Sequence, residues 1–557
     1  MAATAYIQDY QPFAFDDFSG GINLRDKADT VGDKEAIDLL NVTFTERGAI
    51  RQRDGYSDLT SADLTNRVDS LSAYYTAGGV KQLVAGCGTR LEAIDTGGAT
   101  VASATGLTGP GPYSMVRFAA PGSEHLYATN GVDAPRRWDG SAWTTPTATV
   151  NGTAASAMPK AGAFAVTAAL PGSTAGSNAN NRLVAGAYPS GATTSGPGGT
   201  ASNPSRVHFS NAGDPLTWET DGAGSPVRGQ NWRDLTPGDG EAIMGIVSWQ
   251  ELTFIFKETK FFVLWGESTA ADGTPTFQIR EVISGVGLAA RHACTAGRDG
   301  VYFLGRRGMY VTTGGPPQIL SDKISPLWRG DPDVYYQGSP INLSQIALAR
   351  LAWMDDQLYV AVPTGAATAN DRTLVYDTQH QWWSIYDAPA AALCAFRRAD
   401  RDELHFGYSA TLTPKRIGRI GLSILTDRGT AMTSRWRSGW SDYGQPVVKT
   451  FRETKMWAYG AVNVGFAVDY NKAITASAGT VFNVPALWPA GGGTWADWIA
   501  SNGGNWPSAG EVSDRMIRRA VQGTTFSTQF SNHPSTQTWA MHRVVRHLRE
   551  TRGTSVL

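Results

Sequence analysis

The sequence has few charged residues and no long apolar run. Charged residues make up 17% of its 557 positions, against ~25% in ordinary soluble domains. The formal net charge of −1 gives no global field that would attract nucleic acid or an anionic membrane. No stretch approaches the ~20 apolar residues that cross a bilayer, and Met1 to Tyr10 lack the regions of a secretory signal peptide. We therefore expect synthesis in a cytoplasm and no membrane-spanning segment.

Cysteine is also scarce, and catalytic signatures are missing. Cys87, Cys294 and Cys394 lie far apart and outside any CxxC or Cys/His cluster. Zinc sites and disulfide frameworks need such groupings, so we expect three buried free thiols. The sequence contains none of the phosphate-loop, metalloprotease, serine-hydrolase or calcium-loop motifs. We predict a protein with no catalytic residue, no metal site and no cofactor.

What the sequence does contain favours many short strands. Hydrophobic residues make up 41% of the chain, and glycine occurs 63 times. Over residues 68–427, a strand, a turn and a second strand ending near Trp or Tyr recur at roughly 40–60 residues, the length of a four-stranded blade. Strand pairs are clearest at 252–265, 301–311 and 357–377. Because one blade cannot bury both its faces, blades must stack around an axis. We predict an all-β, β-propeller-like domain of small antiparallel sheets, with the number of blades left open.

Three other segments depart from this repeat. Residues 1–67 form an extended N-terminal segment with a predicted short helix over 34–40, capped by Gly32–Asp33. This segment either docks on a neighbouring subunit or closes the propeller by adding a strand to the last blade. Residues 147–204, rich in Ala, Gly, Ser, Thr and Pro, are predicted to be a loop insertion that contains one strand over 181–186. Residues 428–557 are predicted to form a separate C-terminal β unit.

Two patterns resemble glycosidase features but fit a structural role better. Ser210–Trp218 contains the residue types of the Asp-box turn of sialidase propellers, in another order and only once. We expect Asp214 and Pro215 to set a bend, with Trp218 packed beneath it. Asp16–Asp17 and Asp355–Asp356 are paired carboxylates by type. Adjacent residues of a strand point to opposite faces, so neither pair is expected to act together.

Five arginines are candidates for contacts within an assembly or with DNA: Arg51, Arg53, Arg543, Arg546 and Arg549. Arginine can meet DNA phosphates or the carboxylates of a partner protein, although a solvated face is the commoner explanation. The stretch from Trp539 to Arg549 fits a helix by the spacing of its apolar residues. A final strand is the alternative.

Several stretches, taken in order, resemble the tail nozzle family of short-tailed bacteriophages, also called tail tubular protein B. They are FSGGINLR at 18–25 with EAIDLLN at 35–41 and RGAIRQRDGY at 47–56, then RVHFSNAGDPLTW at 206–218, GEAIMGIVSW at 240–249 and RWRSGW at 435–440. The resemblance implies a hexameric ring in the virion tail, below the portal and adaptor proteins. It also implies a lumen for viral DNA that stays closed until ejection, with tail fibres or spikes as further partners.

Two other functions remain open for this sequence. One is a propeller that binds or depolymerises glycans on the host surface, as a receptor-binding protein would; its motivation is the Asp-box-like turn and the tryptophan content. The other is a tail-hub or tail-tip protein of a long-tailed phage. The nozzle interpretation predicts ring formation without hydrolytic activity, and this separates it from the glycan interpretation.

Overall fold

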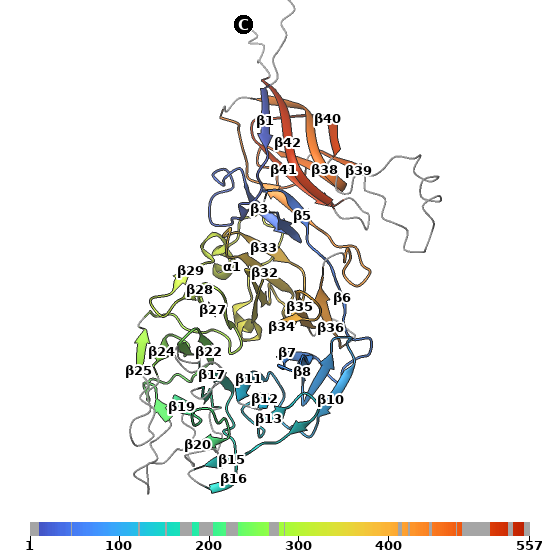
Figure 1. Cartoon of the computed structure of the whole chain (residues 1–557). Helices are drawn as coiled ribbons and strands as arrows, with labels where there is room; N and C mark the ends of the chain where they lie inside the picture. Colours follow the sequence, from blue (N-terminus) through green and yellow to red (C-terminus); the bar gives the residue numbers. More distant parts are fainter. Residues whose placement is uncertain are drawn as a thin grey trace, which may run out of the picture.

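The computed structural model consists of a β-propeller joined to a C-terminal β unit (Figure 1). It describes residues 11–550 apart from Glu46, 121–122, 151–152, 168–180, 189–203, 219–231, 267–277, Ile283, 410–414, 422–423, 445–447, Thr475, 482–512 and 533–538.

Seven four-stranded antiparallel sheets make up the propeller within the described residues. The first two blades are β7 (Val68–Tyr75), β8 (Lys81–Cys87), β9 (Arg90–Asp95), β10 (Thr100–Ala104), and β11 (Ser114–Ala120), β12 (Ser123–Thr129), β13 (Arg136–Trp138), β14 (Trp143–Thr144). The third and fourth are β17 (Ala163–Val166), β18 (Leu183–Gly186), β19 (Arg206–Phe209), β21 (Trp232–Asp234), and β22 (Gly245–Trp249), β23 (Leu252–Phe256), β24 (Phe261–Trp265), β25 (Gln278–Val282).

The remaining three blades lie next in the chain. The fifth and sixth are β26 (Cys294–Ala296), β27 (Val301–Gly305), β28 (Gly308–Thr312), β29 (Gln318–Ile319), and β30 (Arg350–Met354), β31 (Gln357–Val362), β32 (Arg372–Asp377), β33 (Trp383–Tyr386). The seventh is β34 (Ala390–Arg397), β35 (Asp402–Tyr408), β36 (Ile417–Ile420) and β6 (Tyr56–Asp58). The helical turns between the fifth and sixth blades are η1 (Asp322–Ile324), α1 (Pro326–Arg329) and η2 (Leu343–Leu348).

The first strand of each blade lies at the axis, and these strands form a closed ring. Each of β7, β11, β17, β22, β26, β30 and β34 contacts the next, and β34 returns to β7. The predicted strand pairs at 252–265, 301–311 and 357–377 are present as β23–β24, β27–β28 and β31–β32. The all-β propeller predicted from the repeat is therefore present.

The last blade takes its outer strand from the N-terminal segment. β6 pairs antiparallel with β36, with Tyr56 opposite Ile420 and Asp58 opposite Gly418. Of the two alternatives for residues 1–67, the structure thus shows the closing strand. A strand contributed from 360 residues away thus joins the ends of the ring by hydrogen bonds.

Residues 18–58, which we call the clasp, link the propeller to the C-terminal unit. β2 (Gly21–Ile22) and β3 (Glu35–Leu40) join one side of the C-terminal sheet, whereas β4 (Val42–Phe44) and β5 (Ile50–Gln52) join the other. β1 (Gln11–Phe15) pairs with β42, and Figure 1 shows this blue strand beside the red one.

The predicted helix over 34–40 is wrong, because the segment is strand β3. It lies between β2 and β37 (Arg435–Ser438), with Leu39 opposite Trp436. Residues 36–40 are all buried, so both faces of the segment are covered. A seven-residue helix has little stability of its own, and a run buried on both faces is typical of a central strand.

The C-terminal unit contains β37, β38 (Lys449–Val468), β39 (Ala476–Val481), β40 (Ser513–Gly523), β41 (Phe526–Asn532) and β42 (Trp539–Glu550). Lys449, at one end of β38, lies opposite Gly523, while Asp469, just past the other end, donates its N–H to Thr525 O at 3.0 Å. A straight strand of this length would span ~65 Å. β38 is therefore sharply bent, with its first half between β40 and β42 and its second between β39 and β41.

The loop insertion predicted at 147–204 is wrong for much of that range. β15 (Thr147–Val150) and β16 (Thr153–Ala157) form a small sheet with β20 (Thr217–Trp218), and β17 belongs to the third blade. The strand predicted over 181–186 is confirmed as β18 of the same blade. Residues 168–180 and 189–203 lie outside the described residues. The small side chains that suggested a loop, such as Ala163 and Ala185, are buried between blades, where small residues permit close packing.

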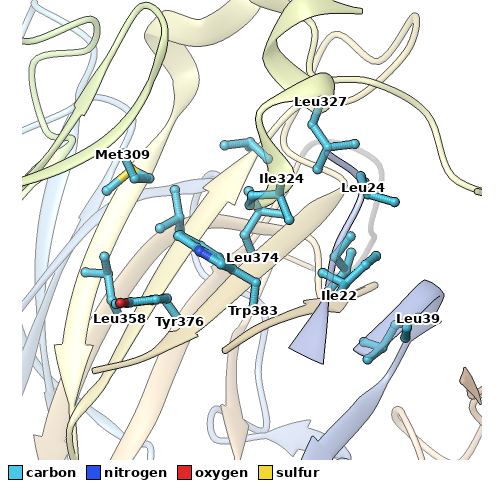
Figure 2. Packing of buried hydrophobic residues seen from close by; sticks show 14 of the residues in the cluster. Ile22, Leu24, Leu39, Met309, Ile324, Leu327, Leu358, Leu374, Tyr376 and Trp383 are labelled. Carbon is cyan, nitrogen blue, oxygen red and sulfur yellow. The ribbon is translucent and has the colours of Figure 1, made fainter. Parts of the chain in front are cut away.

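One hydrophobic core runs from the propeller through the clasp into the C-terminal unit. Figure 2 shows Ile22, Leu24 and Leu39 of the clasp close to Ile324, Leu327 and Trp383 of the propeller. The same cluster continues to Trp436 and Phe530 beyond the clasp. Because buried apolar surface is shared across these joints, the clasp holds both units together.

Candidate functional site

Arg53, one of the predicted contact residues, is a buried structural arginine. Its side chain is 1% exposed and forms ion pairs with Asp387 at 2.8 Å and with Asp427 at 2.6 Å. Its Nε donates to Asn41 Oδ1 at 2.8 Å, and the guanidinium lies over the rings of two tyrosines. The two carboxylates raise the pKa of Arg53 above its ordinary value despite burial. The prediction that Arg53 reaches DNA or a partner is therefore wrong for this chain's folded state.

Asn41 organises the residues around Arg53. Its backbone N–H donates to Ile385 O at 2.8 Å, and its side-chain amide donates to Thr433 O at 2.7 Å. Its Oδ1 also accepts from the N–H of Asp387 at 3.0 Å. With φ at +53°, residue 41 has the left-handed conformation that Asn tolerates better than most residues. Asn41 thus ties the clasp to the sixth blade and to the linker before β37.

Arg51 is the neighbouring candidate and differs from Arg53. Its side chain is 34% exposed and pairs with Asp54 at 3.2 Å. On β5 it faces away from the buried side, since residues 50 and 52 are buried and 51 is half-buried. Of the two N-terminal arginines, Arg51 is the one that solvent reaches.

The three C-terminal candidates lie on strand β42, so the helical interpretation of this stretch is wrong. Arg546 is buried, lies over the ring of Phe15 at 4.4 Å and donates to Tyr443 Oη. Arg543 is exposed and lies over the ring of Trp457 at 5.3 Å. The side chain of Arg549 lies outside the described residues. The structure does not gather the five arginines into one patch: it buries Arg53 and Arg546 at separate places.

The Asp-box-like segment is a structural turn, as its sequence predicted. Asp214 accepts from Leu216 N at 2.9 Å and from Thr217 Oγ1 at 2.6 Å. Trp218 is fully buried, and its Nε1 donates to Pro215 O at 3.1 Å. The hydrogen bonds of Asp214 and Trp218 are thus all formed within the turn itself.

The paired aspartates form no catalytic pair. Asp355 and Asp356 occupy the turn between β30 and β31, both with positive φ, and not a strand as expected. Asp356 pairs with Arg298 at 3.1 Å. Asp17 accepts from Ser19 and Lys34, whereas Asp16 is exposed. Within each pair, the two carboxylates therefore differ in their contacts and do not face one common partner.

The expected free thiols are present, but only one is fully buried. Cys87 is buried, while Cys294 and Cys394 are half-buried on the innermost strands of their blades. Burial raises the pKa of the Cys294 thiol to about 12, so it stays protonated at neutral pH.

In the described part of the chain, no group of three or more His, Cys, Asp or Glu side chains gathers to hold a metal ion. None of the described helices is long and apolar enough to span a membrane.

A cavity of about 210 Å³ lies on the propeller axis. All seven innermost strands or the residues next to them line it, including Asp69, Tyr113, Phe164, Gly245, Cys294, Arg350 and Ala392. We call it the axial cavity. It is smaller than the ~300–1,000 Å³ of most sites for drug-sized ligands.

Positive charge exceeds negative charge in the axial cavity. Its charged or titratable lining consists of Asp69, Tyr113, Arg291, His292, Cys294 and Arg350. Asp69 is paired with Arg67 at 2.6 Å, beside the cavity. Burial, with Arg350 and Arg291 nearby, lowers the pKa of His292 to about 3.

Arg350 is held by backbone carbonyls, and no carboxylate pairs with it in the part of the chain that the structure describes. Its Nη1 donates to Leu348 O at 3.1 Å and to Ala349 O at 2.8 Å, at the end of η2. Its Nε is buried with no partner in the described residues. Burial, together with the like charge of Arg67 and against the attraction of Asp69, lowers the pKa of Arg350 to about 10.

No protein-family model matches the sequence, and no curated protein sequence matches it either.

Solved structures give only distant likenesses. BBS1N, from a complex with ARL6DN, is 12% identical with a TM-score of 0.38, and the match covers 67% of this chain and 98% of that one. Virginiamycin B lyase from Staphylococcus aureus is 12% identical with a TM-score of 0.35, covering 65% and 98%. The extracellular domain of the one-component system BT4673 from B. thetaiotaomicron is 8% identical with a TM-score of 0.38, covering 74% and 47%. The blade assignment rests on the strand pairing within this chain.

Sequence reasoning missed the axial cavity. Its residues lie on different blades, and only the ring brings positions such as Asp69, His292 and Arg350 together. One signal was available: Arg291 and His292 follow the Gly285–Ala290 turn, directly before an innermost strand. Charged residues at the start of an innermost strand are natural candidates for the axis.

Proposed function

We propose that the chain is a non-catalytic structural subunit of a bacteriophage tail, which forms a ring as the nozzle through which DNA is ejected. The ring, expected to be a hexamer, would sit below the portal and adaptor proteins, contact tail fibres or spikes, and keep the virion closed until ejection. Its resemblance to tail nozzle proteins motivates the proposal.

One structural observation supports this proposal most. Two of the stretches that carry the resemblance lie 400 residues apart in the sequence, yet they pair in space. Residues 35–41 form β3, and 435–440 begin with β37; Ala36 lies opposite Ser438 and Leu40 opposite Arg435. Asp38 of the first stretch also accepts from the guanidinium of Arg435 in the second. Short similarities that converge on one joint are easier to explain by common architecture than by chance.

The size of the axial cavity bears on where DNA would pass in such a ring. Because the cavity holds only about 210 Å³, we place the DNA lumen outside the propeller. Several copies arranged around a common axis supply such a lumen. The proposal therefore depends on self-association, and a monomeric particle has no use as a nozzle.

Purified protein provides the test, alone and mixed with adaptor rings. We expect negative-stain images and mass photometry to show rings of this chain on the adaptor. Compact monomers under both conditions would contradict the proposal. Release of reducing ends from host glycans would favour the glycan-depolymerising alternative.

Arg543 offers a residue-level test of assembly or DNA contact. It is exposed on β42, so Arg543→Glu reverses one surface charge without opening the core. We expect reduced ring formation or reduced DNA ejection, with an unchanged melting temperature. Arg298→Glu is the matched control, since Arg298 is 53% exposed on the propeller. Equal behaviour of the two variants would remove Arg543 from the contact surface. Arg53→Glu is unsuitable here, because its side chain is buried.

A further inference from the structure

The axial cavity contains more partly buried positive charge than its own residues neutralise. Asp69 is the one carboxylate among the described residues that line it. Arg67 holds this carboxylate at 2.6 Å. Arg291 and Arg350 therefore remain without an ion pair in the described structure. Burying a cation is costly unless it is paired and hydrogen-bonded, so this arrangement favours an anion from outside.

The donor groups match the chemistry of an oxyanion. Arg350 lines the cavity without a carboxylate partner among the described residues, while its Nη1 is occupied by carbonyls. Arg291 lines the same cavity and is half-buried, so solvent and ions reach it. Guanidinium groups present planar forks of N–H donors that fit phosphate oxygens. His292 lines the cavity with them, and the charges of both arginines act on it.

We propose that the axial cavity binds one small oxyanion of the phosphate type, held by Arg291, His292 and Arg350. The cavity volume of about 210 Å³ suits such a ligand and its waters. The bound anion contacts the segment before β26 and the start of β30, so it joins the fifth and sixth blades at the axis. This site is independent of the ring assembly proposed above, and either proposal can fail without the other.

Two sources would present the same chemistry to this cavity. One is free inorganic phosphate; the other is the phosphate group of a larger molecule, such as a nucleoside monophosphate. Both would place the same oxygens against the two arginines. The size of the cavity favours free phosphate, because a nucleoside requires additional room.

Isothermal titration of the full chain with inorganic phosphate tests the site, with chloride at matched ionic strength as reference. We expect one phosphate per chain and a rise in melting temperature that chloride does not give. Arg291→Gln should bind phosphate about tenfold more weakly or worse, because one charge-assisted contact is lost. Arg306→Gln, which removes a charge 69% exposed and away from the cavity, should bind as the wild type does.

A second readout keeps the test valid if a variant folds poorly. In the wild type, an anion beside His292 should raise the pKa of its ring from about 3 toward its ordinary value, as followed by NMR during a phosphate titration. Equal effects of phosphate and chloride, or full phosphate affinity in Arg291→Gln, would overturn the proposal. Stronger binding of adenosine monophosphate than of phosphate would assign the site to the phosphate group of a larger ligand. Stronger binding of free phosphate would assign it to the ion itself.

Discussion

Arg53 and Arg350 are the same side chain in two opposite situations. Arg53 lies in the clasp, paired with Asp387 and Asp427 and bonded to Asn41. Arg350 lies at the axial cavity, bonded to backbone carbonyls with one nitrogen unpartnered among the described residues. The surroundings raise the pKa of Arg53 and lower the pKa of Arg350 to about 10. Arg53 therefore joins segments of the chain through ion pairs, whereas Arg350 has no carboxylate partner among the described residues.

Loss of the Arg53 charge should have the largest effect. Arg53→Met leaves two partly buried carboxylates facing each other without their cation. We expect the free energy of unfolding to fall by about 3–5 kcal/mol, the cost of breaking a buried pair on one side. Urea denaturation followed by circular dichroism measures it. The matched control is Arg51→Met, whose half-exposed pair should be worth about 0–1 kcal/mol; equal losses in both variants would contradict the distinction.

Removal of the Asn41 side chain should have a smaller effect at the same joint. Asn41→Ala takes an acceptor from Arg53 and from the Asp387 N–H, and a donor from Thr433 O. We expect a loss of about 1–3 kcal/mol, because buried groups lose their partners. Asn41→Asp keeps both acceptor contacts and should be less harmful. If it is as damaging as alanine, the joint does not depend on these bonds.

Arg350→Met should cost about 1 kcal/mol or less, since carbonyl contacts are lost but no carboxylate is stranded. The variant also removes a positive charge from the surroundings of His292. The pKa of His292 should therefore rise from about 3, as read from NMR titration of the histidine ring. A loss of stability as large as that of Arg53→Met would erase the contrast between the two sites.

The smallest expected effect concerns the acid sensitivity of the axial cavity. His292 has a pKa of about 3 in the folded chain, below the ordinary value of 6.5. On acidification the unfolded chain therefore takes up its proton first, and stability is lost as pH falls through 6.5 toward 3. His405, with a pKa of about 4, acts in the same direction. We expect His292→Asn to reduce the stability difference between about pH 7 and about pH 5.5 by about 1 kcal/mol; an unchanged difference would exclude His292.

The propeller could be predicted from the sequence because its signals are local. Pairs such as β23–β24 are adjacent in the chain, and alternating apolar residues with a turn between them specify such a hairpin. The C-terminal unit combines one such local pair, β38–β39, with pairs between distant segments. β3 pairs with β37, and β5 pairs with β42, across hundreds of residues. For that reason β3 was predicted as a helix: its partner strands cannot be read from its own residues.

Site residues were harder to predict than strands for a related physical reason. Alternate positions on one strand suggested that Arg51 and Arg53 share a face, but Asn41, Asp387 and Asp427 bury only Arg53. The role of an arginine depends on where carboxylates arrive from distant segments. Local turns were predicted well, as Asp214 and Trp218 illustrate, because all their partners lie within a few residues.

The outer strand of the seventh blade has a consequence for how the protein is made. Tyr56–Asp58 leaves the ribosome long before Ile417–Ile420, its partner in the sheet. At ~5–20 residues per second, roughly 20 to 70 seconds separate the synthesis of the two. During that interval the clasp has neither a ring to close nor a β42 to pair with. The early strands of the nascent chain thus need shielding from other polypeptides. We expect folding during translation to depend on chaperones.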